Sequence, residues 1–388
     1  MPAVWLLPQA ALAMTSNSPQ NILDSVRSKV EAAERLSPAE GEALFDPQVD
    51  FHGLGELADR VSRRKHGDAA YYNANAHLNP TNVCRFRCPL CAYSRDPDDP
   101  AAYVMSRDEI LQRGEEAAQS GATELHLVGG VHPQKGLDWY LDILSTLHAA
   151  FPRLHLKAWT AVEVAWLAQL TGLSIRSVLE QMIAAGLGSL PGGGAEIFHP
   201  EVRRQIAPLK ADGDTWLAVH RTAHELGLRS NATMLYGHVE SAAHRIDHLV
   251  RLRELQDQTG GFQAFIPLAF HPDGTQLSHL VHRRPTAAED LRVMAISRLF
   301  LDNFDHVKAY WISLGVGTAQ VALCYGADDL DGTVRHEKIH HEAGSEAPEI
   351  LSIAELRSLI LETGRQPIER DTLYRPVRRQ GTHWEVQA

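Results

Sequence analysis

Three cysteine residues lie close together in the sequence and form the strongest candidate for a metal centre. Cys84, Cys88 and Cys91 follow the spacing C-x3-C-x2-C, and the one remaining cysteine, Cys324, lies far away in the sequence. A structural zinc site or a ferredoxin cluster ordinarily takes four protein ligands. Three thiolates suit three irons of a [4Fe-4S] cluster and leave the fourth iron free for an external ligand. The spacing therefore predicts a cluster that takes part in chemistry.

An open iron of this kind can chelate the amino and carboxylate groups of S-adenosylmethionine. One electron from the cluster then cleaves the sulfonium and releases a 5′-deoxyadenosyl radical, which the protein must orient and shield. We expect Gly129 and Gly130 to let the backbone approach the methionine part, because glycine has no Cβ. We also expect Tyr93 to lie against the adenine and Glu163 to contact the cofactor. The alternatives are simple packing for Tyr93, and a zinc knuckle or unrelated thiols for the cysteines.

Short apolar strands alternate with helices from about residue 72 onward, which predicts the α/β class and a parallel (β/α)8 barrel of the TIM type. The expected strands are His77–Pro80, Glu124–Gly130, His155–Ala161, Gly188–Gly192, Ser230–Tyr236, Phe262–Phe270, Val307–Leu314 and Val321–Tyr325. The expected helices include Trp139–Phe151, Ser174–Ala185, Thr215–Leu226, His244–Gln256 and Ala287–Asp302.

The remaining chain divides around this barrel. We expect residues 1–20 to be a disordered extension, 21–70 an N-terminal helical region, 71–335 the barrel, and 336–388 a C-terminal extension with a helical segment. Ser37 and Glu40 form a capping box that opens a helix. The first thirteen residues faintly resemble a signal peptide but lack a basic start, and Met14 is an alternative start of the protein.

The unusual polar residues and glycines sort to the predicted strand ends, where β/α-barrel enzymes keep their active sites. We expect His238 and His271 to be catalytic, contacting substrate carboxylates or relaying protons, although each can also be a structural hydrogen-bonding residue.

A second motif competes with the cysteines. His336, Glu337 and His340 spell H-E-x-x-H, the signature of zinc peptidases when it lies on a helix. Here it follows an aspartate-rich loop, and Gly344 soon interrupts it. We therefore keep a zinc peptidase as a remote alternative.

Composition excludes other classes of protein. The net charge of −11 argues against a nucleic-acid or anionic-membrane surface, because phosphate binding is dominated by Lys and Arg. The sequence has no apolar run of about 18 residues, the length that a transmembrane helix needs. Clustered cysteines without a disulfide framework indicate a reducing, cytoplasmic location.

Longer sequence motifs carry a family resemblance over residues 35–375. Together with the cysteine spacing, they resemble the aminofutalosine synthases, radical S-adenosylmethionine enzymes of menaquinone biosynthesis by the futalosine pathway. These motifs begin at His77, Leu127, Ser189, Ser230, Gly261 and Ala327. Two sister families share the spacing and the barrel, namely the dehypoxanthine futalosine cyclases and the radical subunits of deazaflavin (FO) synthase.

The resemblance implies a transferase reaction in which the adenosyl radical adds to the enol-ether double bond of 3-[(1-carboxyvinyl)oxy]benzoate. Rearrangement and loss of a carboxyl group then give 6-amino-6-deoxyfutalosine, and methionine is released. S-adenosylmethionine is a co-substrate in this reaction. An electron donor such as flavodoxin or ferredoxin is the implied partner. Because the substrate carries two carboxylates, the resemblance also predicts cationic or hydrogen-bonding groups at the barrel mouth. The candidate substrate contacts that it implies are His132, Glu196, Asn231, Tyr236 and Arg284.

Overall fold

A computed structural model describes residues 19–387 of the chain. The expected disordered extension over residues 1–20 therefore falls outside the described residues, apart from its last two, which begin helix α1 (Pro19–Glu31). The alternative start at Met14 also lies outside them.

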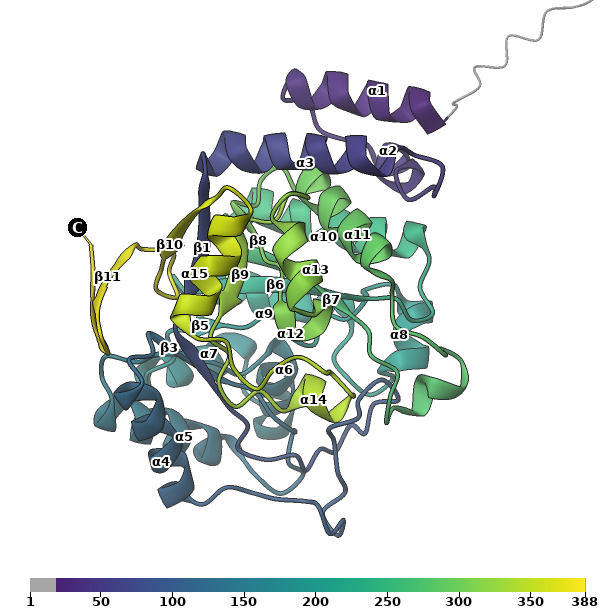
Figure 1. The fold of residues 1–388 in the computed structure, drawn as a ribbon. Helices are drawn as coiled ribbons and strands as arrows, with labels where there is room; N and C mark the ends of the chain where they lie inside the picture. The colour runs from purple at the N-terminus through teal and green to yellow at the C-terminus, as the bar shows by residue number, and fades with distance from the viewer. Residues whose placement is uncertain (1–18, 388) are drawn as a thin grey trace, which may run out of the picture.

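A seven-stranded parallel sheet forms the centre of the fold, and its strands follow one another in chain order (Figure 1). This sheet curls into a half-barrel and confirms the α/β class, with seven of the eight expected strands in place. The strands are β2 (Asn75–Leu78), β3 (Glu124–Leu127), β4 (His155–Ala158), β5 (Ser189–Leu190), β6 (Arg229–Tyr236), β7 (Phe262–Ala269) and β8 (His306–Val307).

The eighth expected strand, Val321–Tyr325, is wrong. Its first residues belong to helix α13 (Val316–Ala322), and the rest form a turn. The preceding strand also ends earlier than expected, because helix α12 (Trp311–Leu314) follows β8 closely. A short apolar run fits a buried helix as well as a strand, so periodicity alone does not separate the two.

An acidic strand takes the missing place. In β9 (Asp329–Gly332), Asp329 forms a parallel bridge to Lys308, directly after β8. A few residues further on, Arg335 bridges Ala76 of β2. The segment from Asp329 to Arg335 therefore lies between the last and the first strands of the central sheet and continues the barrel wall.

Two further sheets lie outside the central one. β9 also pairs in parallel with β1 (Ala69–Asn73), and β1 pairs with β10 (Gln366–Glu369) on its other side. The C-terminal strands β11 (Val377–Gln380) and β12 (His383–Val386) form an antiparallel hairpin. The segment that follows the barrel thus returns to β1, the first strand of the described chain.

Helices connect the strands and surround the sheet, and the helices expected from the sequence are confirmed to within a few residues (Figure 1). The connecting helices are α4 (Arg107–Gln119), α5 (Leu137–Ala150), α6 (Ala161–Thr171), α7 (Ile175–Ala184), α8 (Pro200–Ile206), α9 (Gly213–Glu225), α10 (Ala242–Thr259) and α11 (Ala287–Phe300). The short α14 (Ile339–Glu342) and α15 (Ile353–Glu362) follow the barrel.

The N-terminal helices α1, α2 (Pro38–Ala43) and α3 (Phe51–His66) lie together at one end of the barrel (Figure 1). The capping box predicted before α2 is confirmed. The Glu40 amide donates to Ser37 Oγ at 3.3 Å, and the Ser37 amide donates to Glu40 Oε2 at 2.8 Å.

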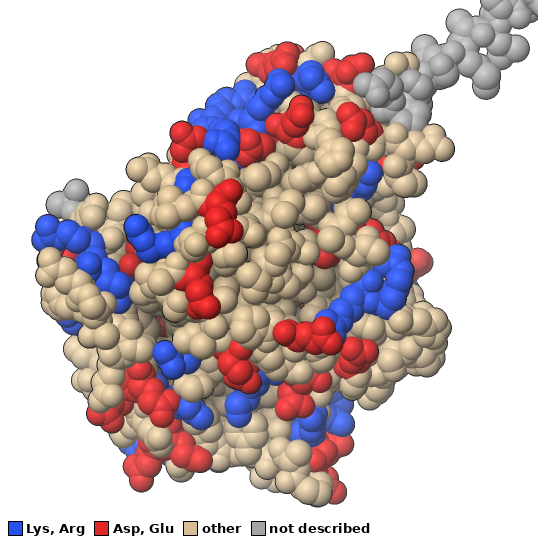
Figure 2. All heavy atoms as spheres, in the orientation of Figure 1, with Lys and Arg blue, Asp and Glu red and all other residues tan. Residues whose placement is uncertain are grey.

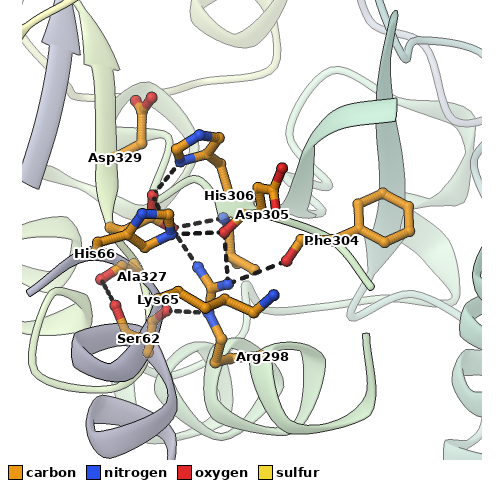
Figure 3. A network of polar contacts seen from close by, with 12 residues as sticks. Ser62, Lys65, His66, Arg298, Phe304, Asp305, His306, Ala327 and Asp329 are labelled. Carbon is orange, nitrogen blue, oxygen red and sulfur yellow. Dashed lines mark hydrogen bonds and ion pairs between the residues drawn. The ribbon is translucent and has the colours of Figure 1, made fainter. Parts of the chain in front are cut away.

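A buried polar network joins α3 to the barrel (Figure 3). Arg298 on α11 donates to the carbonyl of Asp305 at 2.9 Å and pairs with the Asp328 carboxylate. The same carboxylate lies 2.5 Å from His306 Nδ1. On α3, a ring nitrogen of His66 lies 2.8 Å from the carbonyl oxygen of Asp305. These contacts lie at the amino ends of β8 and β9, on the side of a β/α barrel that is built for stability rather than catalysis.

The surface carries both signs of charge. On the face drawn in Figure 2, Lys and Arg side chains are interspersed with Asp and Glu, so neither sign covers that face. Among the residues described, every helix is too short or too polar to cross a bilayer.

Candidate active site

The three clustered cysteines lie on the wall of one cavity at the carboxyl ends of the barrel strands. Cys84, Cys88 and Cys91 all line this cavity, whereas Cys324 is exposed after α13 and is not part of the lining. The loop that carries the three is held by backbone hydrogen bonds, from the Cys84 amide to the Arg95 carbonyl at 3.1 Å and from the Cys91 amide to the Cys88 carbonyl at 2.9 Å. The donor set is therefore three thiols on one wall, as a [4Fe-4S] cluster with an open iron requires.

Gly129 and Gly130 line the same cavity, and both are packed tightly against the chain that precedes Cys84. The Gly130 amide donates to the Thr81 carbonyl at 2.8 Å. A Cβ at Gly129 would lie 2.9 Å from the same Thr81 oxygen, and one at Gly130 would overlap the carbonyl of Val83. The missing Cβ atoms are thus required by the chain that leads into Cys84. The predicted contact of these glycines with the cofactor remains a prediction.

Tyr93 also lines the cavity and is buried. Its hydroxyl lies 2.5 Å from the hydroxyl of Tyr103 and donates to the Thr81 carbonyl at 3.3 Å. These contacts hold its ring against the cavity wall, beside the cysteines. Stacking on adenine remains a prediction.

Glu163 lines the cavity, and its carboxylate is occupied within its own helix. It forms a capping box at the start of α6, where Glu163 Oε2 accepts from the Thr160 amide at 3.0 Å and from the Thr160 hydroxyl. Burial raises the pKa of this carboxyl group. The structure therefore gives Glu163 a capping role, and its contact with the cofactor remains a prediction.

Glu196 and Lys210 form a buried ion pair beside the cysteines. Glu196 Oε1 lies 2.6 Å from Lys210 Nζ, and both side chains line the cavity. Burial opposes the charge of Lys210, but Glu196 and the nearby Cys88 and Cys91 sulfurs raise its pKa. The ammonium group therefore provides a positive charge next to the thiolates.

Asn231 and His271 line the cavity, and each has a buried polar atom without a hydrogen-bond partner among the described residues. These atoms are Asn231 Oδ1 and His271 Nδ1. The other ring nitrogen of His271 lies 2.8 Å from the Ser313 carbonyl oxygen and must donate to it, which leaves Nδ1 as the acceptor. Burial lowers the pKa of His271 to about 4, so its imidazole is neutral at pH 7. Both residues can accept a hydrogen bond from a ligand.

Four predicted site residues do not line the cavity. His132 Nδ1 accepts from the amide of Gln134 at 3.1 Å. Nε2 of His238 lies 3.0 Å from the carbonyl oxygen of Leu235. The remaining two bind elsewhere: Tyr236 donates to Asp290 at 2.7 Å and Arg284 to Asp273 at 3.1 Å. Tyr236 and His238 face a smaller hollow beside the barrel mouth instead. None of these four side chains is part of the lining that carries the cysteines, and their roles in catalysis or substrate binding remain predictions.

The H-E-x-x-H string does not form a zinc site. His336 lies outside α14 with a positive φ of 68°, and its Nε2 is 3.3 Å from Glu116. Glu337 instead accepts hydrogen bonds from the His340 amide at 3.0 Å and lies 3.1 Å from His341 Nδ1. The two motif histidines therefore have different partners. The peptidase interpretation is wrong because the string is not on one helix face.

Two buried ion pairs lie among the strand residues of the cavity wall, and neither was predicted from the sequence. Lys157 Nζ is 2.7 Å from Glu124 Oε2, and Lys308 Nζ is 2.8 Å from Asp331 Oδ1. All four side chains are buried and line the cavity. The available signal was a single charged residue inside a short apolar strand, as in Leu156-Lys-Ala158. Such residues are rarely buried unless they are paired.

Two histidines lie beside these pairs. His77 on β2 and His126 on β3 are opposite each other in the strand register, with ring centroids 4.6 Å apart. Both line the cavity, and the Nε2 atom of each is buried without a partner among the described residues. Burial lowers the pKa of His77, and it lowers that of His126 to about 3, so both rings are neutral at pH 7.

A separate group has the spacing of a metal site. Ligand atoms of His66, His306 and Asp328 lie within 4.8 Å of one another. However, both oxygens of Asp328 are already engaged, one by Arg298 and the other by His306. The network is complete without an ion, so we interpret it as structural.

Sequence comparison matches residues 78–252 to the radical SAM superfamily and residues 259–382 to the CofH/MqnC C-terminal region. The chain is 45% identical over 355 residues to the aminodeoxyfutalosine synthase of Thermus thermophilus, covering 91% of this chain and 95% of that protein. It is 44% identical over 359 residues to the synthase of Streptomyces coelicolor, covering 90% and 92% of the two chains.

More distant relatives were also found. The chain is 40% identical over 344 residues to a 5-amino-6-(D-ribitylamino)uracil–L-tyrosine 4-hydroxyphenyl transferase of Methanopyrus kandleri, covering 87% and 93% of the two chains. Among solved structures, methylornithine synthase has a TM-score of 0.70 at 15% identity, covering 88% and 97% of the two chains. The hydrogenase maturase HydG has a TM-score of 0.69 at 14% identity, covering 91% and 77%. These two structures show the fold alone.

Proposed function

The chain belongs to the aminodeoxyfutalosine synthases of the radical S-adenosylmethionine superfamily, and on that premise we propose its substrate and product. The adenosyl group of S-adenosylmethionine is joined to the enol-ether carbon of 3-[(1-carboxyvinyl)oxy]benzoate. Methionine is released and a carboxyl group is lost, which gives 6-amino-6-deoxyfutalosine. The higher identity to the synthases than to the tyrosine transferase favours this reaction over that of the transferase.

The residues present fit the cofactor that this family uses. Cys84, Cys88 and Cys91 are the three protein ligands for a [4Fe-4S] cluster, and the cavity that they line leaves room for a ligand on the fourth iron. When bound, the cluster supplies the electron that cleaves S-adenosylmethionine. The Lys210 ammonium group stabilises negative charge on the cysteine side of the cavity.

The cavity wall suits a reaction that water would quench. Between the cysteines and the opposite strands, the lining is mainly apolar. The polar groups that remain, such as Asn231 and His271, are buried and can orient a substrate. A closed, dry site prevents side reactions of a reactive intermediate. The apolar lining residues include Phe86, Leu90, Leu235, Ile266, Leu268 and Phe270.

The observation that carries the proposal is the meeting of three cysteines, unpartnered polar atoms and an apolar wall in one cavity. The test is an anaerobic reaction of the reconstituted enzyme with S-adenosylmethionine, dithionite and the enolpyruvyl benzoate. We expect one adenosyl-bearing product and one methionine for each S-adenosylmethionine consumed. Release of free 5′-deoxyadenosine with the benzoate substrate untouched would contradict the proposal.

This chemistry also implies an electron donor and a compartment for the reaction. An electron donor such as flavodoxin or ferredoxin supplies the reducing electron, and the reaction takes place in the cytoplasm, where thiols stay reduced. Support of turnover by reduced flavodoxin in place of dithionite tests the first point.

A further inference from the structure

We propose that Lys157 and Lys308 form a subsite at the cavity floor that binds the ring carboxylate of the substrate. The inference rests on the function proposed above, because it concerns the substrate named there. It replaces the histidines and arginine expected at the barrel mouth as the main carboxylate-binding groups.

The strand register places the floor residues at one level. His77, His126 and Lys157 are direct neighbours across β2, β3 and β4. Lys308 directly follows β8 and forms a bridge to Asp329 of β9, the strand that completes the barrel wall. The cysteines instead lie in the loop after β2, toward the carboxyl ends of the strands. The floor is thus the end of the cavity away from the predicted cluster.

This placement matches the length of the substrate. The enol ether must lie at the cysteine side, where the adenosyl group becomes available. The benzene ring separates the enol ether from the ring carboxylate, so this carboxylate is directed away from the cysteines. A substrate that enters the barrel along its axis therefore presents the carboxylate to Lys157 and Lys308.

The two ammonium groups have hydrogen-bond donors to spare. An ammonium group carries three N–H bonds. The described residues engage one of them on each side, through Glu124 for Lys157 and Asp331 for Lys308. The neutral rings of His77 and His126 add an unpartnered Nε2 each, which donates in the Nε2–H tautomer. A carboxylate, which only accepts, fits this surplus of donors.

The desolvation of the buried lysines also favours a ligand that accepts hydrogen bonds. Asp331 Oδ1 lies 2.8 Å from Lys308 Nζ and 3.8 Å from Arg370, whose closer partner is Asp329 at 2.6 Å. Burial lowers the pKa of Lys157, against the effect of its partner Glu124. A ligand carboxylate that accepts hydrogen bonds from Lys157 would offset part of this desolvation.

The test compares two substrates on the reconstituted holoenzyme. One is the enolpyruvyl benzoate, and the other is its benzamide analogue, in which the ring carboxylate is a carboxamide and the enol ether is intact. We expect the unmodified enzyme to have a kcat/KM about 10- to 100-fold higher for the benzoate, the effect of one charge-assisted hydrogen bond. Equal use of both substrates would overturn the subsite, and this comparison depends on no variant.

Paired variants locate the preference on the floor. Lys308→Gln with Asp331→Asn, and Lys157→Gln with Glu124→Gln, neutralise each pair without leaving a buried charge unpaired. We expect about a 10-fold or greater loss of kcat/KM with the benzoate and less than about a 3-fold change with the benzamide. Equal losses with both substrates would show that the pairs are structural only.

The control is Lys29→Gln, which breaks an ion pair of similar length, 2.7 Å, with Glu40 in the N-terminal helices. It should leave the benzoate preference unchanged, and a lost preference there would overturn the assignment to the floor. The reaction of the unmodified enzyme separates the two hypotheses. If it makes no adenosyl-bearing product, the proposed function fails; if it makes the product without a benzoate preference, the subsite alone fails.

Discussion

Gly130 is packed against Val83 so closely that a Cβ at Gly130 would overlap the Val83 carbonyl. Val83 precedes Cys84, so the strand end that carries the glycine supports the start of the cysteine loop. The Gly-Gly pair is thus part of the scaffold of the metal centre, in addition to any contact with the cofactor.

Gly130→Ala is expected to impair cluster binding. The new methyl group must displace backbone rather than a flexible side chain, and such overpacking costs about 1–3 kcal/mol. Iron content and the visible absorbance of the reconstituted protein should both fall. Gly136→Ala is the matched control, because its Cβ would meet nothing within 4 Å. Full iron loading of Gly130→Ala would contradict this explanation.

Cys91→Ala is expected to abolish cleavage of S-adenosylmethionine, because two thiolates do not hold the cluster with an open iron. The measurement is reductive formation of 5′-deoxyadenosine under anaerobic conditions. Cys324→Ser should keep wild-type iron content and activity, since this exposed residue lies outside the cavity. Persistent cleavage by the first variant, or lost iron in the second, would show that the ligands are assigned wrongly.

The segment around α14 should loosen at alkaline pH. A hydrogen bond to Glu337 raises the pKa of His341 to about 9, from an ordinary value near 6.5. A raised pKa means that this pair stabilises the fold fully below pH 6.5 and loses its effect as the pH rises through 9. The effect is below about 1 kcal/mol, because solvent screens a partly exposed pair.

The measurement is the free energy of unfolding in urea at pH values from 6 to 10, for the natural chain and for His341→Gln. The natural chain should lose stability relative to the variant as the pH approaches 9. Parallel pH profiles for the two proteins would rule out this contribution.

Arg298→Met is expected to destabilise the protein by about 3–5 kcal/mol, because it leaves the Asp328 carboxylate buried with one charged partner fewer. Thermal unfolding of the cluster-free protein measures this effect. Because Asp328 is already engaged, addition of Zn²⁺ to the reconstituted protein, whose clustered cysteines hold the iron–sulfur cluster, should not raise its melting temperature. A rise that disappears in His66→Gln would instead reveal a metal site in this network.

The sequence was sufficient where the signal is local. The spacing of Cys84, Cys88 and Cys91 predicted a shared site, and these three residues do line one cavity. The Ser37–Glu40 capping box and the apolar strands up to β7 were also predictable from neighbouring residues. In each case, the pattern that specifies the structure lies within a few residues of it.

The sequence was insufficient where partners come from distant parts of the chain. The acidic strand β9 has no apolar alternation, and its aspartates are stabilised by Lys308 and Arg370. His238 and Arg284 were predicted to act on the substrate, and this remains a prediction; their contacts with the Leu235 carbonyl oxygen and the Asp273 carboxylate could not be predicted from the sequence. A position near a strand end predicts the barrel mouth, but it does not predict the direction of the side chain.

The most direct test of the account follows the carbon atom that the radical chemistry would transfer. The enzyme is incubated anaerobically with S-adenosylmethionine labelled with ¹³C at the 5′ carbon of the adenosyl group, a reductant and the enolpyruvyl benzoate. We predict that the label appears in a product where it is bonded to a carbon atom of the benzoate substrate, as seen by mass spectrometry and carbon–carbon coupling. Label found only in 5′-deoxyadenosine, with the benzoate substrate unchanged, would contradict the account.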